Sequence, residues 1–230
     1  MYTIHVINLD CDTDKMAKFA RQFPYNNRHS RARYTRFAAC DANSENGIQA
    51  DPLCKSWLCT SGVIGCAKSH MTLWKEFVTD VISSDIRIVM EDDARFDLDA
   101  FCDAMDTVCD LLQQPQPVIV SFICIGPFCR TGLKMVRKGK TGVEYTLTQS
   151  VFPLATTAYA INKSAALYLL KKMHNTVYYH IDFEIAQHLA TSFLSGKTLS
   201  SLTHYVVTAP DVYSRPLYRS FRLSIRNKSS

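Results

Sequence analysis

The chain has 230 residues, of which 47% are hydrophobic and 20% charged, and this length and composition are typical of one globular domain. Its net charge is +5, no apolar run reaches the length of a membrane-spanning helix, and the first residues lack the layout of a signal peptide. These features argue against an integral membrane protein and against a secreted one, so we expect a soluble, cytoplasmic protein.

The first half of the chain alternates between the two kinds of apolar pattern. Strands are predicted at 3–9, 34–39 and 86–90, and helices from about residue 13 to 23 and from 63 to 82. In the second helix, apolar residues recur at intervals of three and four positions, as expected for a buried helical face. Residues 41–61, between the second strand and this helix, look irregular because asparagine, glycine and proline interrupt any pattern.

The second half continues the alternation and adds a hairpin. Helices are predicted at 97–112, at 163–173 and directly after residue 182, and strands at 118–123, 156–161 and 204–207, before a basic tail from about residue 212. Residues 133–136 and 144–147 are expected to pair as an exposed antiparallel hairpin. The alternation predicts the α/β class, with a mixed, mostly parallel sheet flanked by helices and the hairpin at its edge. We expect residues 1–230 to form a single domain.

Three consecutive carboxylates, Glu91, Asp92 and Asp93, follow a short apolar strand. Adjacent anions repel one another, so they are tolerated at a strand end mainly where a cation or solvent lies. Ligands bind at the carboxyl ends of strands in α/β folds. The run therefore indicates a divalent metal that holds a diphosphate, and the alternative is a solvated acidic turn. The chain has no G-x-G-x-x-G or Walker A loop, which argues against a dinucleotide oxidoreductase or a P-loop ATPase.

The nine cysteines show no paired C-x-x-C spacing, and several lie within apolar patterns. Free thiols in a reducing compartment are therefore expected. Cys66 and His70 are the only close cysteine–histidine neighbours, and they supply two of the four ligands of a structural zinc site. The sequence alone thus argues against zinc.

Two basic clusters, at residues 28–36 and 215–228, account for the excess positive charge. Such clusters attract phosphate, either of a nucleic acid or of a nucleotide, and the alternative is a solvated basic face. A nucleic-acid-binding protein remains one hypothesis, although the chain has no aromatic-and-basic single-strand motif and no recognition-helix signature.

Several short motifs occur in order along the chain. Residues 4–10 read I-H-V-I-N-L-D, residues 36–41 read R-F-A-A-C-D, residues 65–70 read G-C-A-K-S-H and precede Trp74, and residues 157–161 read T-A-Y-A-I. Together with the acidic run, they resemble the family 25 glycosyltransferases, which include bacterial lipooligosaccharide galactosyltransferases and animal collagen galactosyltransferases. The corresponding family patterns are I-x-V-I-N-L-D, R-F-x-A-x-D, G-C-A-L-S-H-x-x-x-W, E-D-D and T-x-A-Y-x-I. The chain departs from the family at Val63, often Glu there, and at residues 11–15 (C-D-T-D-K), which replace an arginine-rich stretch.

The resemblance implies a GT-A-like (Rossmann-like) fold and an enzyme that uses a UDP-sugar and a divalent cation, Mn²⁺ or Mg²⁺. Such an enzyme would transfer galactose or glucose to a hydroxyl of a glycan or protein, with inversion in a single displacement. Oxygen ligands suit this cation, which neutralises charge on the leaving phosphate. Asp93 is expected to bind the metal directly. Glu91 or Asp92 would contact the donor ribose or a metal-bound water, with Glu91 a further candidate ligand, and His204 would supply a second protein ligand.

The other candidates belong to the donor site or act as the base. Asp182, or else Glu184, is expected to accept the proton of the acceptor hydroxyl. The remaining donor-site candidates border the crevice or close over the diphosphate: Asn8, Asp10, Asp41, His70, Arg215 and Arg219. His70 and Trp74 either line this pocket or brace the helix.

A catalytically inactive relative that binds a sugar or a partner is the main alternative, and the substitution at Val63 is the feature that favours it. The sequence does not distinguish a galactose from a glucose donor, and it does not identify the acceptor or the oligomeric state. A compact chain without a signal peptide suits a bacterial or viral cytosol better than a secretory pathway.

Overall fold

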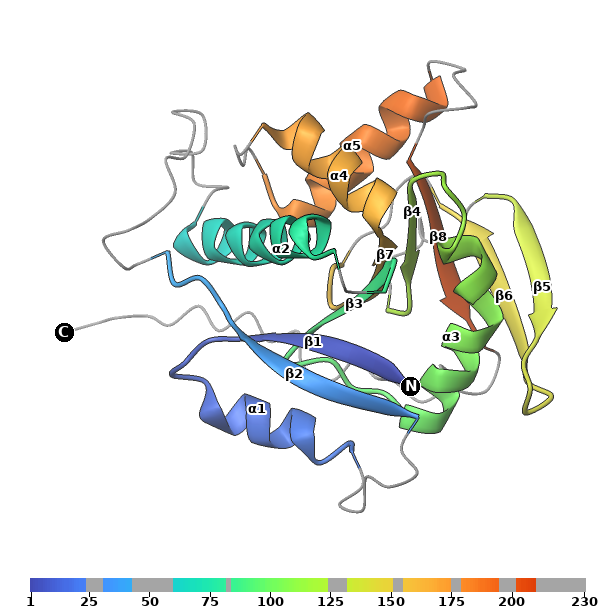
Figure 1. Cartoon of the computed structure of the whole chain (residues 1–230), viewed down its shortest axis with the longest axis horizontal. Coiled ribbons are helices and arrows are strands. Elements are labelled where there is room, and N and C mark those ends of the chain that lie inside the picture. Colours follow the sequence, from blue (N-terminus) through green and yellow to red (C-terminus); the bar gives the residue numbers. More distant parts are fainter. Residues whose placement is uncertain are drawn as a thin grey trace, which may run out of the picture.

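A computed structural model of the chain describes residues 1–23, 31–42, 60–81, 84–123, 132–150, 155–174, 179–194 and 202–209. In these residues one eight-stranded sheet runs through the molecule, with helices on both of its faces (Figure 1). Most of the stretch predicted to be irregular and the whole basic tail, with Arg215 and Arg219, lie outside the described residues.

The order of strands in the sheet is β2-β1-β3-β7-β4-β8-β6-β5. The strands are β1 (Tyr2–Asn8), β2 (Ala32–Ala38), β3 (Ile86–Glu91), β4 (Val118–Ser121), β5 (Lys134–Lys138), β6 (Glu144–Gln149), β7 (Ala158–Asn162) and β8 (Thr203–Thr208). The α/β class with a mixed sheet flanked by helices is confirmed. The expectation of mostly parallel pairing is corrected, because three of the described pairings are parallel (β1/β2, β1/β3, β4/β8) and four are antiparallel.

Five described helices cover the sheet, and each face has its own hydrophobic core. Helices α1 (Thr13–Ala20) and α3 (Leu98–Leu112) pack on one face, whereas α2 (Ser61–Thr79), α4 (Lys163–Met173) and α5 (Ile181–Leu194) pack on the other (Figure 1). Burial of these apolar side chains provides the main stabilisation of the fold. Helix α1 ends three residues before the predicted end, and α5 starts at Ile181, which places Asp182 in its first turn.

Helix α2 packs against both α4 and α5 and reaches the site described below. Its N-terminus is capped by Thr60, whose hydroxyl accepts a hydrogen bond from the Val63 amide at 3.4 Å. One face carries the apolar residues spaced by three and four positions, and Leu73, Trp74 and Phe77 are fully buried there. The predicted periodicity of this helix is therefore confirmed.

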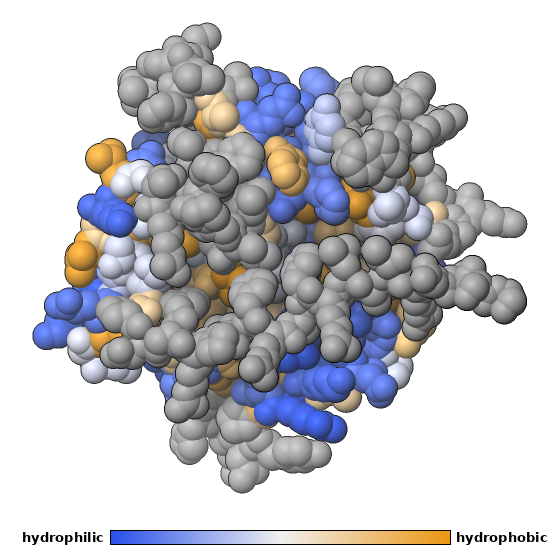
Figure 2. Space-filling view, turned by 180° about the vertical axis from the view of Figure 1, so that it is seen from behind, coloured by the Kyte–Doolittle hydropathy of each residue, from blue (hydrophilic) through white to orange (hydrophobic). Residues whose placement is uncertain are grey.

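The predicted hairpin forms strands β5 and β6, and β5 lies at the edge of the sheet. Buried Asp103 on α3 anchors it, since its carboxylate accepts hydrogen bonds from the Thr141 hydroxyl at 2.6 Å and the Tyr145 hydroxyl at 3.0 Å. On the molecular face seen from behind, hydrophobic residues of the described part lie scattered among hydrophilic ones (Figure 2). Among the described helices, none is long and apolar enough to cross a bilayer.

Candidate functional site

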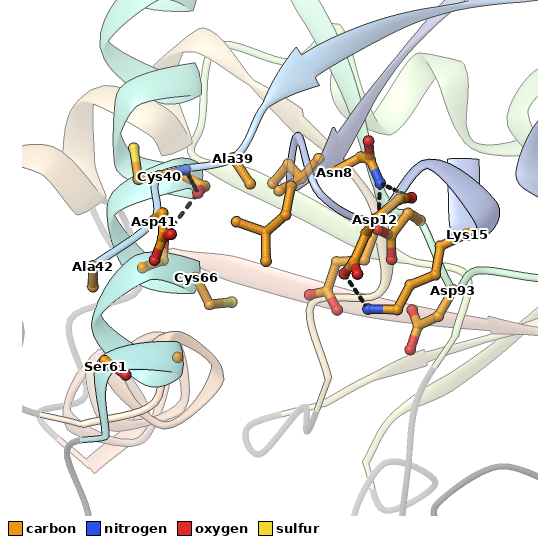
Figure 3. A pocket seen from close by; sticks show the side chains of 17 residues that line it. Asn8, Asp12, Lys15, Ala39, Cys40, Asp41, Ala42, Ser61, Cys66 and Asp93 are labelled. Carbon is orange, nitrogen blue, oxygen red and sulfur yellow. Dashed lines mark hydrogen bonds and ion pairs between the residues drawn. The ribbon is translucent and has the colours of Figure 1, made fainter. Parts of the chain in front are cut away.

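Parallel pairing brings the carboxyl ends of β1, β2 and β3 to the same edge of the sheet. A pocket of about 310 Å³ opens at this edge (Figure 3), which is within the roughly 300–1,000 Å³ common for small-molecule sites. Its walls come from the end of β1 and the start of α1, the segment after β2, the first turns of α2 and the acidic turn after β3. The lining residues are Ile7, Asn8, Leu9, Asp12, Lys15, Ala39, Cys40, Asp41, Ala42, Ser61, Gly62, Gly65, Cys66, Ser69, Glu91, Asp92 and Asp93.

The wall made by α2 depends on a close approach between helix and backbone. A Cβ atom added at Gly65 would lie 2.5 Å from the Cys40 carbonyl oxygen, so only glycine fits there without a shift. One turn later, the Ser69 hydroxyl accepts a hydrogen bond from the Cys40 amide at 2.8 Å and donates to the Gly65 carbonyl at 2.7 Å. These contacts fix the segment after β2, including Asp41, which is exposed at the pocket wall.

The acidic run divides its side chains between different partners. Asp92 is nearly buried, and its carboxylate accepts a hydrogen bond from the Asn8 side-chain amide at 2.7 Å. Asn8 also donates to the Asp12 carbonyl at 3.0 Å, and its own oxygen accepts from Arg36 at 2.8 Å. Burial raises the pKa of Asp92, and the Asn8 hydrogen bond only partly opposes this effect. Asn8 and Asp92 therefore hold the edge of the sheet together as well as lining the pocket.

Asp93 is exposed at the pocket, on the side that faces α1 (Figure 3). Its pKa is raised by burial of the carboxyl group and by the neighbouring charges of Glu91 and Asp92. Lys15, on α1, donates to the Asp12 carboxylate at 2.5 Å and is the cationic side chain among the described residues that line the pocket. A concentration of carboxylates that raises a pKa is a setting in which a divalent cation is stabilised.

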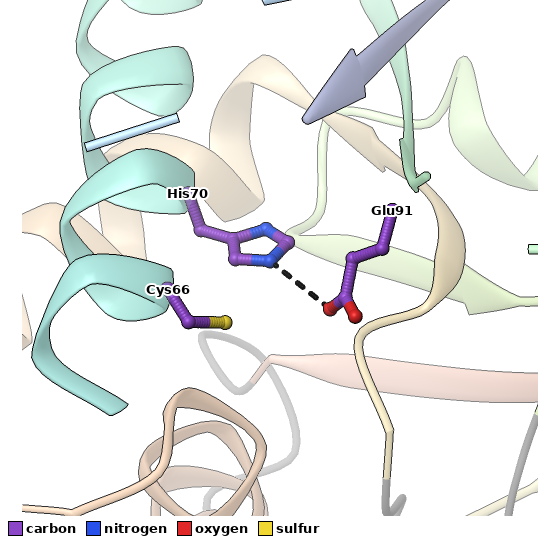
Figure 4. Close-up of side chains that lie close together, drawn as sticks. All are labelled: Cys66, His70 and Glu91. Atoms are coloured by element: carbon purple, nitrogen blue, oxygen red, sulfur yellow. Dashed lines mark ion pairs between the residues drawn. The ribbon is translucent and has the colours of Figure 1, made fainter. Parts of the chain in front are cut away.

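Glu91 points the other way, toward α2. Its carboxylate accepts a hydrogen bond from the Thr156 hydroxyl at 2.8 Å, and its Oε1 lies 3.5 Å from Nε2 of His70. Burial raises the pKa of Glu91, but His70 and Thr156 lower it more, so the pKa lies below its ordinary value. The pKa of the Cys66 thiol is strongly raised, first by burial and then by the charges of Glu91 and Asp182. Figure 4 shows the side chains of Cys66, His70 and Glu91 converging.

His70 itself is completely buried behind the pocket wall. Its Nδ1 lies 2.8 Å from the Tyr159 hydroxyl, which also accepts a hydrogen bond from Trp74 at 2.9 Å. Trp74 is part of the core and does not line the pocket. Of the two roles considered for these residues, the structure gives Trp74 a bracing position and places His70 between the core and Glu91.

Asp182 is linked to the Glu91 contact through Ala155 and Thr156, and the backbone of Ala155 is strained. Ala155 has a φ of 101°, a conformation that costs a non-glycine residue about 1–3 kcal/mol. Its amide donates to the Asp182 carboxylate at 3.2 Å, which also accepts from the Phe183 amide at 2.9 Å. The strained residue directly precedes Thr156, so Asp182 helps to direct the Thr156 hydroxyl toward Glu91.

Other predicted site residues are not brought to the pocket. Glu184 is buried, and its carboxylate accepts from the Tyr179 amide at 3.0 Å, so it holds the turn before α5. Buried His204 pairs with the Ser121 hydroxyl at 2.8 Å and lines a separate small cavity that also includes Asp182. Burial lowers the pKa of His204 to about 3. Asp10 projects into solvent and pairs with Arg36, outside the pocket lining.

The described arginines of the first basic cluster are exposed, and each has a partner within the protein. Arg31 pairs with Asp106, Arg33 donates to the Thr3 hydroxyl at 3.2 Å, and Arg36 binds the end of β1. The carboxylates of Asp106 and Asp10 offset the charges of Arg31 and Arg36, which reduces the positive charge available for phosphate. This cluster therefore lends little support to the nucleic-acid hypothesis.

Three residues at the site were not predicted from the sequence: Lys15 and Cys66, which line the pocket, and Thr156, which contacts Glu91 beside it. Lys15 lies in the first turn of the helix that follows the first strand, and the start of such a helix faces the ligand edge in α/β folds, which is a usable signal. Thr156 and Cys66 reach the site only through contacts between segments distant in sequence, which no local pattern shows.

The donor set at the acidic turn fits a hard divalent cation. Carboxylate oxygens are the ligands that Mn²⁺ and Mg²⁺ prefer, and Asp93 presents such a group to the pocket without a described side-chain partner fixing it. His204 does not belong to this set, because it lines the other cavity.

Comparison with known proteins gave one match at the level of families. A family model described as "Glycosyltransferase family 25 (LPS biosynthesis protein)" matches residues 1–185. Among solved structures, a 4-diphosphocytidyl-2C-methyl-D-erythritol synthase from Anaerococcus prevotii is similar over 89% of this chain and 70% of that chain, at 10% identity. The TM-score of 0.35 is too low for that likeness to carry an argument. No curated protein matches the chain.

Proposed function

Because the chain belongs to glycosyltransferase family 25, we propose that it transfers galactose or glucose from a UDP-sugar to a hydroxyl of a glycan or protein, with a divalent cation and with inversion. The observation that carries the proposal is the pocket at the carboxyl ends of β1, β2 and β3, where Asp93 lies exposed beside Lys15. The same edge of the sheet holds the chain segments that contain the motifs of the family.

Asp93 is the proposed protein ligand of Mn²⁺ or Mg²⁺; Glu91, the second candidate from the same acidic run, is the weaker one because its carboxylate points toward Thr156 and His70. When bound, the cation would neutralise charge that develops on the diphosphate as it leaves the sugar. Asp92 is assigned a supporting role, because Asn8 already engages its carboxylate. Loss of the hydrogen bond from Asn8 to Asp92 would therefore change the geometry of the acidic turn after β3.

Lys15 is the proposed electrostatic partner of the leaving diphosphate. Its ammonium lies at the pocket wall, and a fixed positive charge stabilises negative charge that grows in the transition state. Arg215 and Arg219, in the tail outside the described residues, remain candidates for the same task. Asn8 and Asp41 are proposed to contact the nucleoside from the ends of the first two strands.

Asp182 is proposed as the general base. The acceptor oxygen forms a bond to the anomeric carbon while the bond from that carbon to the phosphate oxygen breaks, and the hydroxyl proton moves to the carboxylate. Asp182 is half-buried, lies beside Thr156, and keeps capacity to accept because each of its oxygens receives one backbone amide. Glu184 is the weaker candidate, since it is buried and bound to the Tyr179 amide.

Release of UDP tests the proposal without knowledge of the acceptor. The protein is incubated with a panel of UDP-sugars, with Mn²⁺ or with a chelator, and slow hydrolysis of the donor is followed. Metal-dependent release from a single UDP-hexose supports both the reaction class and the sugar. Silence across the panel, together with no thermal shift by UDP and Mn²⁺, would instead favour a non-catalytic protein that binds a sugar or a partner. Asp182→Asn should retain metal-dependent UDP binding and lose transfer.

A further inference from the structure

Three potential metal ligands of different chemistry converge beside the pocket: Cys66, His70 and Glu91. Their ligand atoms all lie within 4.8 Å of one another, although Glu91 is far from the other two in sequence. Cys66 and His70 are one turn apart on α2, so both side chains leave the same face of the helix. Glu91 ends β3 and faces them (Figure 4). We propose that these three side chains form a binding site for a zinc-class divalent metal, separate from the oxygen ligands at Asp93.

The imidazole provides the independent observation behind this assignment. His70 is fully buried, and its Nε2 has no hydrogen-bond partner among the described residues. Buried polar atoms of this kind are nearly always satisfied, so an unpaired one points to a ligand. The nitrogen lies 3.5 Å from the Glu91 oxygen, too far for a good hydrogen bond. Two atoms bound to one tetrahedral zinc at about 2.0–2.1 Å would lie roughly 3.3 Å apart, close to this spacing.

The surroundings supply the outer contacts that metal ligands normally have. Nδ1 of His70 lies 2.8 Å from the Tyr159 hydroxyl, and the Thr156 hydroxyl donates to Glu91 at 2.8 Å. A ligating histidine usually donates its other N–H to a fixed acceptor, and ligating carboxylates are themselves hydrogen-bonded. When Nδ1 carries the proton and donates to Tyr159, Nε2 presents its lone pair to the site.

The choice of metal follows from the ligand types. Thiolate and imidazole favour Zn²⁺ or Co²⁺ over Mn²⁺ and Mg²⁺, which prefer oxygen. Binding would release the Cys66 thiol proton to solvent, and the thiolate and the carboxylate would balance the two positive charges of the ion. The sequence showed only Cys66 and His70, which are too few ligands for a structural zinc site. The fold adds Glu91, and three protein ligands with one open position are characteristic of catalytic zinc sites. Cys66 and Glu91 line the pocket, so the open position would face it.

Cobalt spectroscopy on the reduced, chelator-treated protein tests the site without any turnover. One equivalent of Co²⁺ should produce a thiolate-to-cobalt charge-transfer band, and Zn²⁺ should abolish it by displacement. Cys66→Ser should remove the band and weaken Zn²⁺ binding, measured by calorimetry, by more than the roughly 10–100-fold that loss of an outer partner costs. The matched control is Cys109→Ser on α3, a partly buried free cysteine outside the cluster, which should keep the band.

Two further variants make the outcome decisive. His70→Gln should also lose the tight Zn²⁺ site, whereas Asp93→Asn should retain it, because Asp93 belongs to the other ligand set. Absence of a thiolate band in the wild-type protein would overturn the proposal, and so would a band that persists in Cys66→Ser. Circular dichroism and thermal unfolding of each variant show whether it is folded. The cobalt spectrum of the wild-type protein reports metal binding alone, so it tests this site whether or not the protein transfers a sugar.

Discussion

The contact between α2 and the segment after β2 makes a prediction about two glycines of the same helix. In Gly65→Ala, the new Cβ would lie 2.5 Å from the Cys40 carbonyl oxygen and 3.4 Å from the Ala42 amide nitrogen. Both are backbone atoms, so the helix and the segment must separate. In Gly62→Ala, three residues earlier, the nearest atom is the Thr60 hydroxyl at 3.9 Å, an ordinary contact.

The two substitutions are expected to change the free energy of unfolding in opposite directions. Alanine favours a helix over glycine by about 1 kcal/mol, a gain available at both positions. Overpacking typically costs about 1–3 kcal/mol, and this clash with backbone belongs at the upper end of that range. We therefore expect Gly65→Ala to lower the free energy of unfolding by about 1–2 kcal/mol, whereas Gly62→Ala should raise it by up to about 1 kcal/mol.

Urea unfolding followed by circular dichroism measures both changes. With an m-value of about 2–3 kcal/mol/M, the midpoint of Gly65→Ala should fall by roughly 0.5 M and that of Gly62→Ala should rise slightly. An unchanged m-value would confirm that stability itself has changed. Equal midpoints for the two variants would refute the close approach, and with it the described geometry of this pocket wall.

Three other predictions concern hydrogen bonds and charge. Asp103→Ala should lower the free energy of unfolding by about 2–3 kcal/mol, because it removes the buried carboxylate that accepts hydrogen bonds from the Thr141 amide and hydroxyl and from the Tyr145 hydroxyl, while UDP binding is unchanged. The pKa of Asp103 is depressed, so this stabilisation is present at neutral pH and is lost as the pH falls through that pKa; urea midpoints across pH check the sign. Thr156→Val should raise the pKa of Glu91, visible in a carboxyl titration by NMR, and an unshifted Glu91 would contradict the described hydrogen bond. The pKa of Asp93 is raised by burial and neighbouring charge, so protons should begin to weaken Mn²⁺ binding at a higher pH than they would at an ordinary aspartate, whose pKa is about 3.9; calorimetry showing constant affinity down to that pH would be the contrary result.

Local patterns were sufficient for much of the architecture. The helical period of α2, the alternation of strands with helices and the edge hairpin all follow from the spacing of apolar residues, which determines the faces that must be buried. The direction and order of strands do not follow from that spacing. Strand β7 lies antiparallel between β3 and β4 because of pairings between distant segments, which explains why parallel pairing was overestimated.

In the candidate site, too, some features could be predicted from local sequence and others depend on the fold. The carboxylates at the end of β3 could be recognised because charge there is costly without a partner. Their individual roles could not, since the strand ends at Glu91 and the chain turns at Asp92 and Asp93, so the strand period no longer sets their directions: Glu91 points toward α2 and Asp93 toward α1. His204 looked equally available in the sequence, but its place in the middle of a buried strand directs it to Ser121. Only the fold reveals such partners.

The central claim is that Asp93 holds a cation that in turn holds the nucleoside diphosphate. Calorimetric titration of UDP into the wild-type protein and into Asp93→Asn, each with Mn²⁺ and with chelator, tests it most directly. We predict that Mn²⁺ strongly tightens UDP binding in the wild type and has no such effect in Asp93→Asn, while both proteins unfold cooperatively. Binding of UDP that is independent of Mn²⁺, or a response to Mn²⁺ that survives in Asp93→Asn, would contradict it.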